Sequence, residues 1–267
     1  MNKVAGLFKG IVVQDRDSVI SETKSGRKDR FLLGKNISKW QINSFYFTNY
    51  SELIAVGGTK RKAKHDIEPR ILVRRTGDSL CCAYLESKAI TESTLYSVWS
   101  INHRYDNKYL FGLLNSSCLN YYIKQLMITN KQAFPQILMT DLEELPIKYH
   151  KNQIPIISIV DFILFARAGS PKLKGEDNSQ FVSEYFEQIL NGCVYELYFG
   201  EEMKKAGVDI LELVEKDLEE VKKLNSEKAI TKLYEKWQEP KNEIRNRLLL
   251  MSTRCHNTIG VIEGSVG

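Results

Sequence analysis

The pattern of hydrophobic and polar positions divides the chain at about residue 150. Up to that point, short runs of β-branched and aromatic residues are separated by glycines and polar turns, a pattern typical of strands. The clearest strand, residues 71–73, follows Pro69 and leads into a Gly-Asp turn at residues 77–78. We expect residues 79–85 to return as its partner and residues 94–102 to add a further strand.

The rest of this first part is predicted to consist of strands, loops and one helix. Residues 31–37 and 44–47 indicate two strands around a turn. Residues 14–30 form a polar hairpin or loop, and residues 57–65 form a flexible basic loop that opens with two glycines. Asn107 is expected to cap the helix near the end of this part.

After residue 150, apolar residues recur at helical spacing. We predict that Gly200 ends the second helix of this part and that Asp209 caps the third. The predicted helices are residues 154–168, 179–199, 210–224, 227–238 and 241–253. The fold class is therefore α+β. A mixed, twisted β-sheet domain with helices occupies residues 1–150, and a mainly α-helical tail or docking region occupies residues 151–267.

Charge is distributed unevenly between these two parts. The first 150 residues hold 22 Lys and Arg against 14 Asp and Glu, whereas the remainder holds 16 against 19, which together give the net charge of +5. A basic first part joined to a mildly acidic second part indicates that only the first part meets a polyanion. No apolar run approaches the roughly 20 residues of a membrane span. Five cysteines without a CxxC pair indicate reduced thiols in a cytoplasmic protein.

Motifs of catalysis and cofactor binding are missing from the sequence. It contains no Walker-type phosphate loop, GxGxxG, HExxH or GxSxG, and no Asn-Pro-Pro-Tyr type motif that would hold an extrahelical adenine. Asp66 and Glu68 followed by Arg70 make only a degenerate nuclease motif. We therefore expect no catalytic residue, no metal site and no cofactor in this chain.

The strongest binding candidate is a basic cluster within residues 58–75, where seven cations face only Asp66 and Glu68. Such a cluster can neutralise several phosphates and so give an affinity that falls steeply with salt. On a strand, Arg74 and Arg75 must point to opposite faces. The alternative is a solvated loop with structural ion pairs. The seven cations are Lys60, Arg61, Lys62, Lys64, Arg70, Arg74 and Arg75.

Residues 14–30 supply further polar candidates on predicted turns. Arginine can hold guanine with two hydrogen bonds, and glutamine can hold adenine in the same way. The alternative is an ordinary charged surface loop. These residues are Gln14, Arg16, Lys24, Arg27, Lys28 and Arg30. The predicted nucleic-acid-binding set is Gln14, Arg16, Lys24, Arg27, Lys28, Lys60, Arg61, Lys62, Lys64, Arg74 and Arg75.

Several short motifs, in their order and spacing, resemble the TaqI-like C-terminal specificity domain. This domain is the target-recognition part of adenine-N6 DNA methyltransferases, including fused type IIG restriction-modification enzymes. The segment at residues 186–199 is similar to the helical tail of the fused enzymes, so the resemblance covers about residues 7–200. The motifs of the domain lie at residues 9–11, 33–37, 69–78, 113–116, 133–137 and 141–147.

The resemblance implies a protein that recognises double-stranded DNA. In the family, a methyltransferase domain binds S-adenosylmethionine and acts on a flipped adenine. That domain is absent from this sequence, so the expected partner is a methyltransferase domain or subunit. The resemblance also implies that loops 14–30 and 55–65 set the DNA sequence that is recognised. The helical region would pack on the methyltransferase, orient the recognition domain or mediate homodimerisation.

Two other hypotheses remain open. The chain could be a protein-interaction module of a restriction-modification complex, with a solvated basic loop, no direct DNA contact and helices that form a docking platform. It could also be a nuclease remnant, which would need convergent carboxylates and a metal site.

Overall fold

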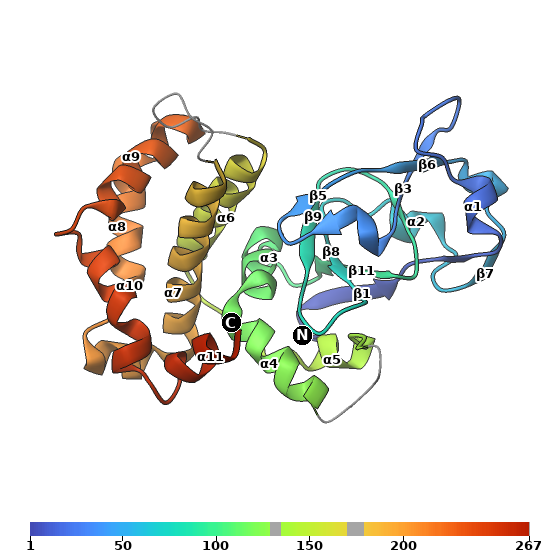
Figure 1. Cartoon of the computed structure of the whole chain (residues 1–267). Coiled ribbons are helices and arrows are strands. Elements are labelled where there is room, and N and C mark those ends of the chain that lie inside the picture. The colour runs from blue at the N-terminus through green and yellow to red at the C-terminus, as the bar shows by residue number, and fades with distance from the viewer. Residues whose placement is uncertain (129–134, 170–178, 267) are drawn as a thin grey trace. The chain divides into compact units, whose positions relative to one another are not determined.

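The computed structural model describes residues 1–128, 135–169 and 179–266 (Figure 1). The chain splits into two compact units. The N-terminal unit comprises residues 1–115 and 122–147, and the helical unit comprises residues 116–121 and 148–267. Ala133 and Phe134, which belong to the motif at residues 133–137, lie outside the described residues.

An antiparallel four-stranded sheet forms the centre of the N-terminal unit. Its order is β1 (Ala5–Lys9), β11 (Leu95–Ser100), β8 (Arg70–Arg74) and β9 (Cys82–Leu85). The strand at residues 71–73, its returning partner and the strand within residues 94–102 are thereby confirmed. Ile71, Leu72 and Val73 are all fully buried because both faces of the sheet are covered, with α3 (Asn107–Asn115) packing against β8, β9 and β11.

Smaller strand groups extend this unit. The sheet β10 (Ile90–Thr91), β3 (Asp29–Leu32) and β6 (Tyr46–Thr48) is mixed, since β10 pairs with β3 in parallel and β6 pairs with β3 antiparallel. Two further pairs are β4 (Ile37–Ser38) with β5 (Gln41–Ile42), and β2 (Val12–Val13) with β7 (Ala55–Gly57). A second hydrophobic cluster of Ile11, Phe31, Leu33 and Ile90 fills the space behind them. Together with the helices, these sheets confirm the α+β fold class.

Short helices occur where the sequence predicts loops. Residues 16–19 form α1 (Arg16–Val19), and residues 62–65 form α2 (Lys62–His65) rather than a flexible loop. The turns η1 (Gly34–Asn36) and η2 (Tyr50–Glu52) are 3-10 helical. Because His65 is fully buried, α2 is fixed to the domain by its last residue.

The helix predicted from Asn107 is divided into α3 and α4 (Ser117–Ile128). The capping residue is Asp106, one position before the predicted Asn107. The Asp106 carboxylate accepts a hydrogen bond from the Lys108 N–H at 2.6 Å, whereas the Asn107 side chain accepts one from the Ser100 N–H at 2.7 Å. The segment before Pro146 contains α5 (Met139–Glu144).

Among the described residues after residue 150, five helices of the helical unit correspond to predicted helices. One further helix was not predicted. The break predicted at Gly200 lies one residue earlier, because α7 is interrupted by a non-helical φ of −124° at Phe199 before it continues to Ala206. Asp209 was also misassigned as a cap. The Glu196 carboxylate instead accepts the N–H groups of Ile210 and Leu211, both at 2.7 Å. These helices are α6 (Ile154–Arg167), α7 (Ser179–Ala206), α8 (Leu211–Val221), α9 (Ser226–Gln238), α10 (Glu243–Arg254) and the unpredicted α11 (Ile259–Val266).

Buried apolar side chains hold the helical unit together. Phe186 of α7 packs against Trp237 of α9 with ring centroids 5.5 Å apart, and both side chains are fully buried. The Trp237 indole N–H donates to Asp217 of α8 at 2.7 Å, so its polar atom is satisfied in the core. Among the described residues, none of these helices is both long enough and apolar enough to cross a membrane.

Candidate nucleic-acid interface

The two loops that the sequence singles out are joined by a short β-ribbon. In this β2–β7 ribbon, Val12 pairs with Gly57 and Val13 with Ala55. The Gln14 N–H then donates to the Ile54 carbonyl at 2.9 Å, which extends the pairing by one step. Loops 14–30 and 55–65, which are far apart in the sequence, therefore lie side by side.

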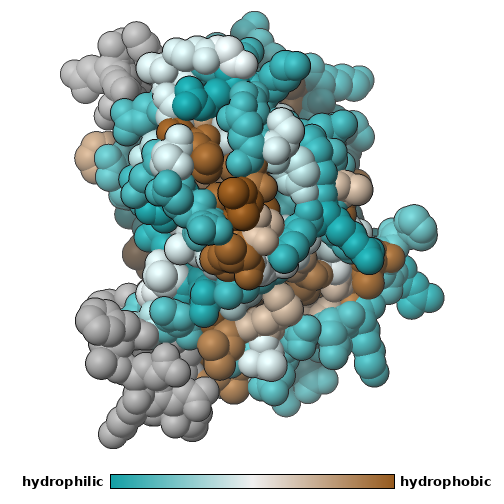
Figure 2. All heavy atoms as spheres, turned by 90° about the vertical axis from the view of Figure 1, so that its right-hand side faces the viewer, coloured by the Kyte–Doolittle hydropathy of each residue, from teal (hydrophilic) through white to brown (hydrophobic). Residues whose placement is uncertain are grey.

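Further contacts fix the two loops to the same end of the N-terminal unit. The Lys28 N–H donates to the Asn49 side chain at 3.1 Å, and the Thr48 hydroxyl donates to the Val19 carbonyl at 2.8 Å. In Figure 1, β6, β7 and α1 lie together at this end. Figure 2 views it directly and shows a mainly hydrophilic face with hydrophobic side chains near its centre.

The predicted residues of these loops differ in their exposure. Gln14, Lys24 and Lys28 are exposed, as are Lys60 and Arg61 just before α2. Arg16 and Arg27 are half-buried, and Arg16 donates to the neighbouring Asp17 carboxylate at 3.0 Å. The ribbon thus joins the two segments that carry these exposed cations, and we call the two segments together the ribbon face: residues 12–30 and 49–64.

Two of the predicted cations hold the domain together. The Lys62 ammonium lies 3.0 Å from Asp66 and 3.5 Å from Asp29, so it connects α2 to β3. The hydrogen bond to Asp66 raises the pKa of Lys62 and keeps it charged. The Lys64 ammonium sits 5.0 Å from the centre of the Trp99 ring, in cation–π geometry. Lys62 therefore forms structural ion pairs, as in the alternative interpretation of the basic cluster.

The arginines of β8 lie outside the ribbon face. Arg70 is fully buried, so it cannot contribute to a basic surface. The Arg74 side chain donates to the Gly34 carbonyl at 3.1 Å and also to the Ile37 carbonyl. Arg75 is half-buried at the strand's end, where the Ile137 N–H donates to its carbonyl at 2.8 Å. The Arg70 and Arg74 side chains thus bind backbone carbonyls of neighbouring segments rather than forming a charged row with Lys60 and Arg61.

Buried groups at its base set the position of the basic loop. The neutral His65 imidazole connects the loop after β7 to β10: its Nε2 lies 2.9 Å from the Thr59 carbonyl, and its Nδ1 lies 3.2 Å from the Thr91 nitrogen. Because the Thr91 N–H can only donate, Nδ1 must accept and Nε2 must carry the proton. Burial lowers the pKa of His65, with the bond to Thr59 opposing it.

We expect the stability of the N-terminal unit to decrease as the pH falls below about 6.5, the ordinary pKa of histidine. Below that value the unfolded chain takes up a proton that folded His65 resists, so the unfolded state is favoured by at most about 1.4 kcal/mol for each pH unit. Denaturant unfolding between pH 5 and pH 8 measures this dependence. His65→Gln should flatten it, whereas His103→Gln on the exposed surface should leave it unchanged. Equal pH profiles for the two variants would contradict the assignment.

Sequence reasoning missed other residues of the ribbon face and its surroundings. Lys35 in η1 is exposed and places its ammonium 5.0 Å from the Tyr46 ring centre. It lines a shallow cavity of about 210 Å³ together with Arg16 and Tyr46. The large apolar side chains Ile54 and Val56 are also exposed, by 63% and 57%. Gly34 was a usable signal, because glycine is one of the residues that favour turns.

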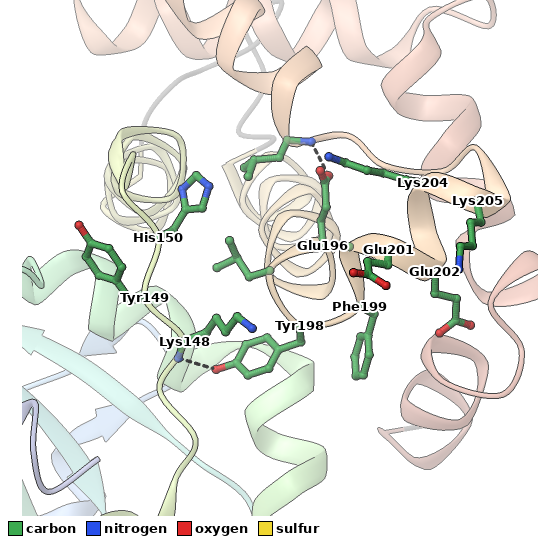
Figure 3. A pocket seen from close by; sticks show the side chains of 13 residues that line it. Lys148, Tyr149, His150, Glu196, Tyr198, Phe199, Glu201, Glu202, Lys204 and Lys205 are labelled. Atoms are coloured by element: carbon green, nitrogen blue, oxygen red, sulfur yellow. Dashed lines mark hydrogen bonds between the residues drawn. The ribbon is translucent and has the colours of Figure 1, made fainter.

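A larger hollow of about 820 Å³ belongs to the helical unit (Figure 3). Lys148 and His150 line one side of it, and α7 residues around the bend at Phe199 line the other. The Lys148 N–H donates to the Tyr198 hydroxyl at 3.3 Å. The Glu196 carboxylate faces this hollow but is occupied as the cap of α8. Across the described residues of the chain, no group of three or more His, Cys, Asp or Glu is placed to hold a metal ion.

Comparison with known protein families identifies the N-terminal unit. The model of the TaqI-like C-terminal specificity domain matches residues 29–147. Residues 29–147 are therefore similar to this specificity domain. The matched segment runs from β3 to α5 and includes β7, α2 and the central strands β8, β9 and β11. The resemblance seen in the sequence is confirmed for this segment.

Among curated proteins, the chain is 28% identical over 141 residues to a protein described as a type II restriction enzyme and methyltransferase of Methanocaldococcus jannaschii. The aligned region is 51% of this chain and 12% of that protein. The specificity domain and its neighbouring residues therefore span only a small part of the relative's length.

Solved structures of restriction-modification proteins are also similar. One is the type IIL restriction-modification enzyme MmeI in complex with DNA, at 12% identity and a TM-score of 0.46, covering 97% of this chain and 36% of that one. Another is the type I S subunit from M. genitalium, at 14% identity and a TM-score of 0.37, covering 83% and 47%. The HsdS subunit from Thermoanaerobacter tengcongensis is 15% identical with a TM-score of 0.38, covering 74% and 44%. This chain spans less than half the length of each.

Proposed function

We propose that this chain is the sequence-specific DNA-recognition module of a restriction-modification adenine-N6 DNA methyltransferase. The observation that carries the proposal is the ribbon face. Within and beside a segment similar to the TaqI-like specificity domain, the β2–β7 ribbon joins two polar loops that both carry exposed cations. The methyl transfer itself, with S-adenosylmethionine as the donor, belongs to a methyltransferase domain or subunit that this sequence does not contain.

In this proposal, the exposed cations of the ribbon face neutralise phosphates of a DNA duplex. Lys28, Lys60 and Arg61 are the clearest members, because each is exposed and lies beside a fixed element of the domain. Phosphate contacts of this kind fix the register of the protein on the duplex, whereas contacts to base edges supply the specificity. In this proposal, Gln14, directly after β2, and Arg16, at the start of α1, contact base edges.

The helical unit is assigned to docking. Large apolar side chains are exposed on it, including Phe181 on α7 and Leu249 on α10, each 65% exposed. Exposed side chains of this size favour contact with another protein surface. The partner would be the methyltransferase domain or subunit, or a second copy of the chain. The same observation favours the second candidate function, a protein-interaction module of a restriction-modification complex without direct DNA contact.

Salt dependence of duplex binding tests the phosphate contacts. In the full chain, replacing Lys28, Lys60 and Arg61 together with alanine should weaken binding to a DNA duplex. It should also reduce the slope of log affinity against log salt concentration by about 0.9 for each phosphate contact that is lost. Fluorescence anisotropy of a labelled duplex at several salt concentrations measures both quantities.

A matched control is available in the helical unit. Replacing the exposed Lys223, Lys228 and Lys241 with alanine removes the same net charge but should change the slope little, because these residues lie outside the ribbon face. If the ribbon-face variant keeps the affinity and slope of the wild type, the proposed phosphate contacts are wrong. If both variants lose affinity equally, duplex binding depends only on the net charge of the chain.

A further inference from the structure

The outer surface of the β2–β7 ribbon has an unusual chemistry for a charged face. Along residues 53–56, the side chains alternate between the two sides of the strand. Leu53 and Ala55 pack inward against the hydrophobic cluster around Phe31. Ile54 and Val56 point outward and are 63% and 57% exposed. The ribbon therefore presents two branched aliphatic side chains to solvent.

The pairing places Gln14 next to these aliphatic residues. Val13 pairs with Ala55 and the Gln14 N–H donates to the Ile54 carbonyl, so Gln14 lies opposite Ile54. Residues directly opposite each other in an antiparallel pair project from the same face. The register shift between Val12 and Val13 leaves Val56 as the extra residue of a β-bulge, a feature that re-aims side chains near functional sites. Gln14, Ile54 and Val56 thus form the outer row of the ribbon.

Cations predominate in the two segments that contain this outer row. The ribbon face contains nine Lys and Arg residues and five Asp and Glu residues. One of the five, Asp29, is paired with Lys62, and another, Asp17, is bonded to Arg16. In Figure 2 the hydrophobic side chains of this end lie near the centre, with hydrophilic side chains around them. An apolar row within a basic surface is complementary to a ligand with an anionic outside and apolar groups inside its groove.

We propose that the β2–β7 ribbon enters the major groove of DNA and recognises A·T base pairs. The inference rests on the proposed function and names the part of the domain that contacts bases. The major groove, about 12 Å wide, admits a two-stranded β-ribbon. Thymine carries a methyl group there, which Ile54 and Val56 contact. Adenine presents N6 and N7 there, which the Gln14 side-chain amide binds with two hydrogen bonds.

Selection of duplexes from a random library by the full chain provides the test. Three proteins are compared: the wild type, the double variant Ile54→Ser/Val56→Ser, and the control Ile101→Ser. Serine has no methyl group to contact thymine, and Ile101 is a similarly exposed isoleucine (55%) of the same unit. The wild type and the control should enrich one motif that contains A·T pairs. The double variant should retain duplexes at low salt but lose the preference at those pairs.

Replacing thymine with uracil in the enriched duplex removes the methyl groups and nothing else. The affinity of the wild type should fall about fourfold for each methyl group that is contacted, the equivalent of one buried CH₂. The double variant should bind the two duplexes equally.

Each other outcome identifies which proposal fails. A motif without A·T pairs, or the same motif and the same uracil effect in wild type and double variant, would overturn the ribbon as the base-reading element while leaving DNA recognition in place. Retention of duplexes without enrichment of any motif would also overturn the ribbon as the base-reading element. If the wild type retains no duplex at any salt concentration, the proposed function fails and takes the inference with it, and a protein becomes the occupant of the ribbon face.

Discussion

Replacing Arg70 with methionine is expected to lower the free energy of unfolding of the N-terminal unit by about 3–5 kcal/mol. The Arg70 guanidinium is fully buried and donates to three carbonyl groups, those of His65, Ile67 and Ala89. Burial lowers its pKa to about 10, which still leaves it charged at neutral pH. Methionine fills much of the volume but leaves three buried carbonyl oxygens without their donor.

Hydrogen exchange of the β8 and β9 amides, followed at increasing denaturant concentration, measures this loss within the N-terminal unit alone. Arg61→Met is the matched control, because Arg61 is exposed and its replacement should change the stability by less than about 0.5 kcal/mol. If the two variants are equally stable, the account of Arg70 as the buried connection between α2, β8 and β10 is wrong.

The second large effect is expected at Gly58, where alanine should cost about 3 kcal/mol of stability and displace the basic loop. Gly58 has a φ of +68°, and a Cβ added there would lie 2.0 Å from the Gly10 carbonyl oxygen. Backbone atoms cannot move aside as a side chain can, so both the left-handed conformation and the close approach require glycine.

Gly26→Ala separates these two contributions. Gly26 has a similar φ of +77°, but nothing lies within 4 Å of its added Cβ, so only the conformational cost of about 1 kcal/mol remains. Thermal unfolding and duplex affinity of both variants give the comparison. Equal losses for the two variants would show that the contact between Gly58 and Gly10 does not fix the loop.

The central sheet could be predicted from the sequence because its signals are local. Residues 71–73 form a β-branched run bounded by Pro69 and a Gly-Asp turn, and the structure places β8 there. The helices α6, α9 and α10 were likewise visible in their 3.6-residue periodicity. At α9 and α10, side chains of Asn225 and Asn242 cap the first turns, as helix starts require.

The ribbon face could be predicted only in part. Its two loops stand out by charge, but β2 and β7 have two and three residues, too few to show a period, and they pair across more than 40 positions of the chain. The aliphatic run at residues 53–56 contains no polar residue, so its alternation of buried and exposed side chains is invisible in sequence. Charge was misleading at Arg70, because a buried arginine and a surface arginine look the same in a sequence.

The helix break expected at Gly200 is present at Phe199, where α7 bends before it continues to Ala206. The error at Asp209 has an origin similar to that at Arg70. Asp209 stands where a cap is usual, but the groups that it would satisfy are bonded to Glu196, which comes from the preceding helix. Tertiary contacts of this kind override local capping preferences because the backbone groups need one acceptor, whichever residue provides it.

The central claim is that this chain recognises a particular DNA sequence. The most direct measurement is the affinity of the full chain for its most enriched duplex relative to a scrambled duplex of the same length and composition, at about 0.15 M salt. Since each wrong base pair costs about 1–3 kcal/mol, we expect the enriched duplex to bind at least about a hundredfold more tightly. Equal affinities for the two duplexes would contradict the claim.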